Sequence, residues 1–201
     1  MMIRYPIPLR RLKIFIKDNK LQGEKIGKGG VFWITGLSGS GKSTLAANVV
    51  SILRARGLPT VLLDGDELRE LHQNLGGGYD RDSRLRTAKF NSSLCKLLAD
   101  QNLYVVCPTI SLFHEIQDWN RSNIARYSEI FIEANIEDLK KLDIKKIYSN
   151  YDEGRINNVV GCDLTAEYPK RPDLVIKYKF GADLKTISTD VINLLIEKNE
   201  N

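Results

Sequence analysis

Residues 36–44 combine glycine, lysine and hydroxyl side chains at a spacing suited to binding phosphate. The segment, Gly-Leu-Ser-Gly-Ser-Gly-Lys-Ser-Thr, matches the pattern GxxxxGK[ST]. Glycines let backbone N–H groups surround a phosphate, Lys42 can reach the β- and γ-phosphates, and the Ser43 hydroxyl can sit on Mg²⁺. A helix that begins here adds its positive dipole end. The predicted phosphate-binding residues are Gly36, Ser38, Gly39, Ser40, Gly41, Lys42, Ser43 and Thr44.

Two carboxylates follow the apolar run at residues 60–63, in the order Asp64-Gly65-Asp66. In phosphoryl transfer, one carboxylate can hold the Mg²⁺ shell while another orients or deprotonates an acceptor hydroxyl. The alternative is a helix N-terminus with favourable acids in its first turn. Because the pair follows an apolar strand in a chain with a phosphate loop, the catalytic interpretation is favoured. Ser43 and Asp64 are the predicted Mg²⁺ ligands, and Lys42, Asp64, Asp66 and, later in the chain, Ser111 are the predicted catalytic groups.

Basic and hydroxyl residues later in the chain are candidates for binding an acceptor. Arg81 and Arg84 are spaced to share a helix face, and arginines hold phosphates by bidentate contacts. A salt-bridged, solvated helix start is an equally good interpretation of that spacing. Ser111 follows a predicted strand and could bind substrate or cap the next helix, which is the commoner role. His114 alone is a weak signal, more typical of a surface position.

Strands and helices alternate from residue 31 onward, so the predicted fold is α/β. Continuous apolar strands separated by helices predict a parallel sheet covered on both faces, with ligands beyond the carboxyl ends of the strands. The expected architecture is the three-layer α/β/α P-loop NTPase fold with a five-stranded parallel sheet and a lid segment. Strands are predicted at 31–35, 60–63, 103–107, 129–133 and 174–177. Helices are predicted at 42–56, 65–75, 81–100, 112–126, 136–142 and 183–198.

Residues 143–172 have little periodicity, and their first part is basic. In a chain with a phosphate loop, such a segment is typical of a lid that closes over phosphates and excludes water. A disordered surface loop is the alternative. We place the lid segment at about 143–165, within a phosphate-loop domain of residues 29–201.

Composition narrows the class of protein further. The chain has 201 residues, 42% of them hydrophobic, and no apolar run near the ~18 residues that cross a bilayer. Three cysteines without a CxxC pattern predict reduced thiols and a cytoplasmic location. Residues 1–28 hold eight basic and two acidic side chains, whereas the rest of the chain sums to −1. This basic N-terminal extension is more typical of a solvated arm than of a nucleic-acid or membrane contact, and a small hairpin is one option at 14–21.

Taken together, these motifs resemble the adenylyl sulfate (APS) kinase family over about residues 30–178. The most specific pieces are the loop at 36–46 and Leu63-Asp64-Gly65-Asp66 with Arg69. Asp80-Arg81, Ile110-Ser111, and Gly161 with Asp163 also fit. The resemblance implies transfer of the ATP γ-phosphate to a ribose 3′-hydroxyl. It implies that Asp66 is the base or a Mg²⁺-shell group, that Arg69 and Arg81 contact the acceptor's phosphate, and that Ser111 lies close to the substrate. Lys145 falls at the lid lysine, and a homodimer is an analogy only.

The departures from that family cluster on the acceptor side. Glu67 replaces an asparagine, Arg84 replaces an asparagine, Thr87 replaces an arginine and His114 replaces an arginine. Two aromatic partners of adenine are also lost, at Val159-Val160-Gly161 and at Gly76-Gly77-Gly78, with Tyr79 a partial substitute. Base stacking on an aromatic ring contributes about 1–3 kcal/mol, so adenine selection is weakened.

The sequence therefore predicts an ATP- and Mg²⁺-dependent kinase of a nucleotide-type small molecule, with no nucleic-acid partner and no membrane span. APS is the default acceptor by resemblance. The alternative is another nucleotide conjugate, such as the cytidine diphosphoramidate used by family members from capsule gene sets. A P-loop hydrolase is disfavoured because the guanine-binding pattern Asn-Lys-x-Asp is absent. An inactive nucleotide-binding module is disfavoured because Lys42, Ser43, Asp64 and Asp66 are all intact. The predicted acceptor-binding residues are Asp66, Arg69, Arg81, Arg84, Ile110, Ser111, His114 and Lys145.

Overall fold

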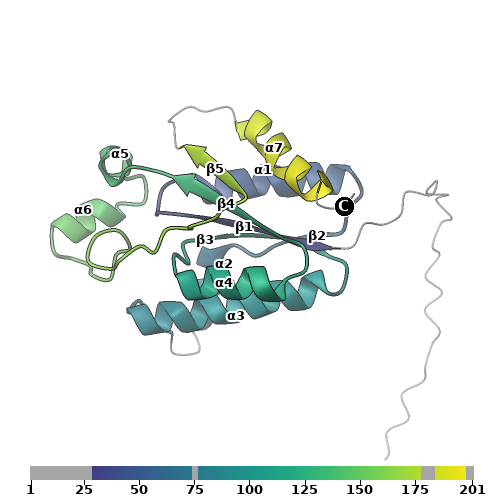
Figure 1. The fold of residues 1–201 in the computed structure, drawn as a ribbon. Helices are drawn as coiled ribbons and strands as arrows, with labels where there is room; N and C mark the ends of the chain where they lie inside the picture. Colours follow the sequence, from purple (N-terminus) through teal and green to yellow (C-terminus); the bar gives the residue numbers. More distant parts are fainter. Residues whose placement is uncertain (1–28, 74–76, 178–183, 198–201) are drawn as a thin grey trace, which may run out of the picture.

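Five parallel strands form the centre of the computed structural model, which describes residues 29–73, 77–177 and 184–197 (Figure 1). The strands are β1 (Gly30–Gly36), β2 (Thr60–Leu62), β3 (Tyr104–Thr109), β4 (Tyr127–Glu133) and β5 (Leu174–Lys177). Their order across the sheet is β2-β3-β1-β4-β5. β1 is therefore central, and Ile34 lies opposite Pro108 of β3 and Ile130 of β4. The predicted five-stranded parallel sheet is confirmed.

Helices cover both faces of this sheet, which confirms the three-layer architecture. In Figure 1, α1 (Lys42–Ala55) and α7 (Leu184–Glu197) lie on one face and contact each other. The opposite face is covered by α2 (Gly65–Gln73), α3 (Arg81–Ala99) and α4 (His114–Asn123). Both faces of β1 are consequently dry, because alternate side chains of a strand point to opposite sides. Phe32 and Ile34 join the core under α1 and α7, whereas Val31 and Trp33 join the core under α3 and α4.

Two short helices lie beyond the carboxyl end of β4: α5 (Ile136–Leu142) and α6 (Ile147–Asp152). The sequence predicts α5 but gives no helix within 143–172, so α6 was missed. α6 has only six residues, too few to show a helical period. It begins because the Asp143 carboxylate accepts the backbone N–H groups of Tyr148 (3.1 Å) and Ser149 (2.8 Å), which satisfies two donors of its first turn.

Other element boundaries differ by a few residues. The helix predicted at 112–126 is shorter, because Phe113 and Ile124 at its two ends are extended. The last two residues of the helix predicted at 65–75 lie outside the described residues. The basic extension and the hairpin considered at 14–21 also lie outside them. The division between residues 1–28 and 29–201 stays a prediction. Across the part of the chain that the structure describes, no helix is long and apolar enough to cross a membrane.

Candidate active site

The phosphate loop connects β1 to α1 at the carboxyl edge of the sheet. β1 is entirely buried, which fixes the start of the loop. Gly39 and Gly41 have φ angles of +77° and +88°, in the left-handed region that favours glycine. The Lys42 ammonium folds back over its own loop and donates a hydrogen bond to the Leu37 carbonyl at 2.6 Å. The loop therefore has the backbone shape and the cation that its sequence predicts for phosphate binding.

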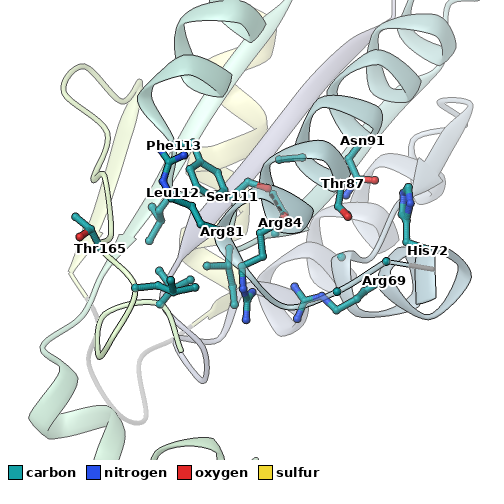
Figure 2. A pocket seen from close by; sticks show the side chains of 18 of the residues that line it. Arg69, His72, Arg81, Arg84, Thr87, Asn91, Ser111, Leu112, Phe113 and Thr165 are labelled. Carbon is teal, nitrogen blue, oxygen red and sulfur yellow. Dashed lines mark hydrogen bonds between the residues drawn. The ribbon is translucent and has the colours of Figure 1, made fainter. Parts of the chain in front are cut away.

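Two pockets adjoin at this edge of the sheet. One, of about 230 Å³, lies between the phosphate loop, Asp64 to Asp66 and Lys145. The other, of about 250 Å³, lies between α2, α3, the end of β3 and residues 160–165 (Figure 2). Their shared wall consists of Gly65, Arg69, Thr109 and Ile110. We call them the donor pocket and the acceptor pocket, because groups bound in the two would meet at this wall.

Gly65 permits that meeting by having no side chain. A Cβ built at this position would lie 2.8 Å from the Pro108 carbonyl oxygen, closer than carbon and oxygen atoms approach without bonding. The absence of a side chain lets the start of α2 pack directly against the end of β3. The carboxylates on either side of Gly65 are thereby held close to both pockets.

Asp66 lines the donor pocket next to Gly65 of the shared wall, and it is paired with the lid segment. Lys145 Nζ lies 2.5 Å from Asp66 Oδ2, and the Asp66 backbone N–H donates to Asp64 Oδ1 at 2.8 Å. Partial burial would raise the pKa of Asp66, but the hydrogen bond and positive charge of Lys145 outweigh it, so the pKa lies below its ordinary value. The carboxylate is accordingly ionised at neutral pH and able to accept a proton.

Replacing Lys145 with Met should raise the pKa of Asp66, because burial then acts without its main opposing charge. Because its pKa is lowered, the paired Asp66 carboxylate stays ionised at a lower pH than an ordinary aspartate does. Loss of Lys145 should narrow the pH range over which Asp66 is ionised. A carboxyl ¹³C NMR titration of Asp66 in the two proteins measures the shift. Lys146→Met, one residue away, is the matched control and should leave the titration in place. An unchanged Asp66 titration in Lys145→Met would contradict the ion pair.

The environment of Lys42 disfavours its charged form when no phosphate is bound. Burial, followed by repulsion from Lys145, lowers the pKa of Lys42 to about 7. Asp66 and Asp64 act in the opposite direction and only partly compensate. A phosphate oxygen near Lys42 would restore the charged form of the lysine, so nucleotide binding and protonation of Lys42 are coupled.

Arginines from two helices make the acceptor pocket positive. Arg69 of α2 and Arg81 and Arg84 of α3 all line it. Arg84 donates to the carbonyls of Tyr79 (2.7 Å) and Asn158 (2.8 Å), which ties α3 to the lid segment. Burial, followed by repulsion from Arg69, lowers the pKa of Arg84 to about 10, so it remains charged at neutral pH. Arg81 and Arg84 could bind a phosphate or form a salt-bridged, solvated helix start. Their place in the pocket supports the anion site, although Arg81 also pairs with Glu167 at 3.2 Å.

Ser111 lies in the acceptor pocket and does not cap α4. The N-cap of α4 is Phe113, whose own side chain makes no capping hydrogen bond. Ser111 Oγ instead lies 2.8 Å from Thr109 Oγ1, at the carboxyl end of β3. Thr35 Oγ1 donates to the Ile110 carbonyl at 2.7 Å, which fixes this strand end against β1. The capping interpretation of Ser111 is therefore wrong, and its position beside an acceptor is retained.

His114 lies outside the pocket lining and faces a carboxylate that the sequence did not indicate. Its backbone N–H donates to Glu167 Oε2 at 2.7 Å, and its ring Nε2 lies 3.0 Å from the Tyr168 carbonyl oxygen. Glu167 also binds Arg81, so it connects α3 to α4. His114 thus contacts Glu167, and Glu167 binds Arg81, which lines the acceptor pocket. His114 itself does not line the pocket.

The lid segment is packed onto the phosphate loop. Tyr148 of α6 donates its hydroxyl to the Ser38 carbonyl at 3.0 Å, and its ring joins an apolar cluster with Leu37, Leu139 and Val159. Burial raises the pKa of Tyr148, so the hydroxyl keeps the proton that it donates. The disordered-loop alternative for this segment is wrong over the helix α6.

Most residues proposed from the sequence meet in the two pockets. The donor pocket includes Ser38, Gly39, Gly41, Lys42, Ser43, Thr44, Asp64, Asp66, Arg69, Ile110 and Lys145. Gly36 and Ser40 line neither pocket. Gly36 instead lets the loop pack against β4, because a Cβ at this position would lie 2.7 Å from the Ile132 carbonyl oxygen. Sequence reasoning missed His72 and Asn91, which line the acceptor pocket from positions that match no motif.

A phosphate loop after the central strand, two carboxylates after β2 and a second pocket across a shared wall define a P-loop kinase. Residues 28–177 match the family model of adenylylsulphate kinase, and the chain belongs to that family.

Relatives with two different printed activities resemble the chain. It is 36% identical over 168 residues to a cytidine diphosphoramidate kinase from Campylobacter jejuni, covering 84% of this chain and 95% of that protein. It is 32% identical over 162 residues to an adenylyl-sulfate kinase from Clostridium kluyveri, covering 79% and 80%. The solved structure of the Mycobacterium tuberculosis APS kinase in complex with AMPPNP and APS has a TM-score of 0.77 at 32% identity, covering 85% of this chain and 99% of that one. The chain is therefore a phosphotransferase acting on a nucleotide conjugate.

Proposed function

We propose that the protein transfers the γ-phosphate of ATP to the ribose 3′-hydroxyl of a nucleotide conjugate, with cytidine diphosphoramidate as the favoured acceptor. The observation that supports the reaction is the pair of pockets that share the Gly65, Arg69, Thr109 and Ile110 wall, with Asp66 in the donor pocket directly beside Gly65 of that wall. ATP would lie on the phosphate loop, and the acceptor on the side of the arginines.

The reaction requires little covalent chemistry from the protein. Asp66 accepts the proton of the 3′-hydroxyl as its oxygen bonds to the γ-phosphorus. The bond between that phosphorus and the β–γ bridging oxygen breaks, and ADP leaves. Lys42 offsets the negative charge on the transferred group, which is where a preorganised cation contributes most. Lys145 leaves its pair with Asp66 and contacts phosphate, while Arg69, Arg81 and Arg84 hold the acceptor's phosphates.

Mg²⁺ fits the donor pocket. The Ser43 hydroxyl and the Asp64 carboxylate are oxygen ligands, and Mg²⁺ characteristically uses one or two carboxylates together with substrate phosphates and water. A bound Mg²⁺ would neutralise charge on the β- and γ-phosphates.

Two features of the acceptor pocket favour the cytidine conjugate. Val159 stands where the APS kinase pattern has its aromatic residue, and it packs in an apolar cluster while its neighbour Val160 lines the pocket. The Tyr79 ring is already occupied by the guanidinium groups of Arg69 and Arg84, at 5.7 Å and 5.6 Å. Stacking for a purine is therefore reduced. The similarity to the C. jejuni kinase, over 95% of its length, supports the same choice. APS remains the second candidate, supported by the likeness to the M. tuberculosis enzyme solved with APS.

A coupled assay of ADP release tests this proposal. The full chain is given ATP and Mg²⁺ with cytidine diphosphoramidate or with APS, and we expect a higher kcat/KM for the cytidine conjugate. ³¹P NMR of the product locates the new phosphate on the ribose. A higher kcat/KM for APS would reverse the choice of acceptor. Turnover of neither compound, with ATP binding intact, would contradict the proposed reaction.

A further inference from the structure

The inner end of the acceptor pocket differs chemically from the part that holds the arginines. Along α3, residues 84, 87, 88 and 91 line the pocket in a row, as the helical spacing dictates. The row begins with the guanidinium of Arg84 and continues with Thr87, Ala88 and Asn91, none of which is charged. His72 of α2 lies beside Thr87 and Asn91 at this inner end (Figure 2). A ligand that spans the row would be anionic at one end and neutral and polar at the other.

Two polar atoms at the inner end are buried without a partner. Asn91 is only 2% exposed, and its Oδ1 has no hydrogen bond to any residue that the structure describes. The same holds for Nε2 of His72. A buried, unpaired polar group costs about 1–3 kcal/mol, so such groups are ordinarily satisfied. An unpaired acceptor in a pocket wall is explained if a bound ligand supplies the missing donor.

We propose that Asn91, supported by Thr87 and His72, binds the amino-bearing edge of the acceptor's nucleobase and selects cytosine or adenine over uracil. The inference rests on the proposed function, because it concerns the acceptor of that reaction. A primary amide presents an acceptor and a donor side by side, which pairs with an exocyclic amino group next to a ring nitrogen. Cytosine and adenine would place their amino donor at the unpaired Oδ1 of Asn91, whereas uracil would place a carbonyl oxygen there, an acceptor that cannot satisfy Oδ1.

The charge distribution assigns this end to the base instead of the phosphates. Arg69, Arg81 and Arg84 already supply the cations that phosphates require, whereas the inner end offers uncharged hydrogen-bonding groups. Asn91 lies seven residues along α3 from Arg84, which corresponds to about 10 Å at 1.5 Å per residue. The row is thus long enough for a nucleotide to place its phosphates and its base edge at opposite ends.

The test compares base preference in the parent protein and in Asn91→Leu, which keeps the side-chain size but removes both hydrogen-bonding groups. Binding of cytidine, uridine and adenosine monophosphates is measured by calorimetry, and kcat/KM is measured for cytidine and uridine diphosphoramidates. We expect the parent to prefer cytidine over uridine by about tenfold or more, the usual effect of a paired base edge. Asn91→Leu should bring the ratio to near one. The adenosine arm shows whether cytosine or adenine is the base selected.

Ser92→Ala is the matched control, because Ser92 also has a buried hydroxyl without a partner among the described residues but lines a different pocket, between α3 and α4. It should leave the ratio unchanged. If Asn91→Leu does not fold, Thr87→Val decides the matter, with an expected loss of at least about threefold in the same ratio.

Three results would overturn the inference: equal binding of cytidine and uridine nucleotides by the parent, an unchanged ratio in the variant, or a change confined to discrimination between a diphosphoramidate and the plain diphosphate. The last would assign Asn91 to the terminal group. Monophosphate selectivity that depends on Asn91, in a protein that turns over no conjugate, would retain the inference and contradict the proposed function instead.

Discussion

Asp66→Asn is expected to lower kcat by about 10²- to 10⁴-fold, the range associated with loss of a positioned general base. The amide keeps the shape of the carboxylate, but it cannot take the proton of the acceptor hydroxyl. Asp66 lines the donor pocket beside Gly65 of the shared wall, and its pairing with Lys145 lowers its pKa, so the parent carboxylate is ionised at neutral pH. ATP affinity should stay within a few-fold, because the phosphate loop and Lys42 remain. Steady-state kinetics and calorimetric titration with a non-hydrolysable ATP analogue measure the two quantities separately.

The control for this variant is Glu67→Gln. Glu67 is the next residue of α2, is exposed and lines neither pocket, so the same carboxylate-to-amide change should leave kcat within about twofold. Full activity in Asp66→Asn would remove the base assignment. A loss that appears only as weaker ATP binding would place Asp66 in the Mg²⁺ shell instead, where it would act on the donor before any proton transfer.

Much of the fold follows from patterns that are local in the sequence. The strand at 30–36 is predictable because it is a continuous apolar run, and its burial on both faces is the reason for that run. The phosphate loop is predictable because its backbone geometry demands glycine at particular positions. α6 is not predictable in this way, since its six residues depend on capping by Asp143 and on the packing of Tyr148 against Leu37.

The residues of the candidate site also fall into two groups, those recognisable from local sequence and those whose role depends on tertiary packing. Residues that act through the backbone or through a fixed motif, such as Lys42 and Asp66, are recognisable from neighbours in the chain. Glu167 and Asn91 are not, because their role arises only when distant segments pack: Glu167 meets Arg81 from 86 residues away. The acceptor side of the pocket consists mainly of residues of this second kind. The specificity for the acceptor therefore depends on tertiary packing, whereas the phosphate loop of the donor side can be recognised from residues 36–44 alone.

Lys42→Met should have opposite effects on activity and on stability. Loss of the cation that offsets charge on the transferred phosphoryl group should lower kcat/KM for ATP by about 10²- to 10³-fold. The free energy of unfolding of the ligand-free protein should rise, because burial and Lys145 disfavour the charged form of Lys42. The pKa of Lys42 is about 7 in the folded protein, against 10.5 for an unperturbed lysine, so between these pH values the unfolded chain binds more protons. The parent's stability should consequently increase with pH across that window, and this contribution to the slope should vanish in the variant.

Urea unfolding at several pH values between 7 and 10 measures the slope, and coupled kinetics measures the activity. Lys141→Met is the matched control, since Lys141 is 75% exposed on α5 and should change neither quantity appreciably. Equal pH slopes in the parent and Lys42→Met would show that the ligand-free loop does not disfavour the lysine's charge. Retained activity would remove Lys42 from the reaction. The combination of a more stable protein with a less active one would show that the phosphate loop holds its lysine at a cost to folding, which a bound phosphate offsets.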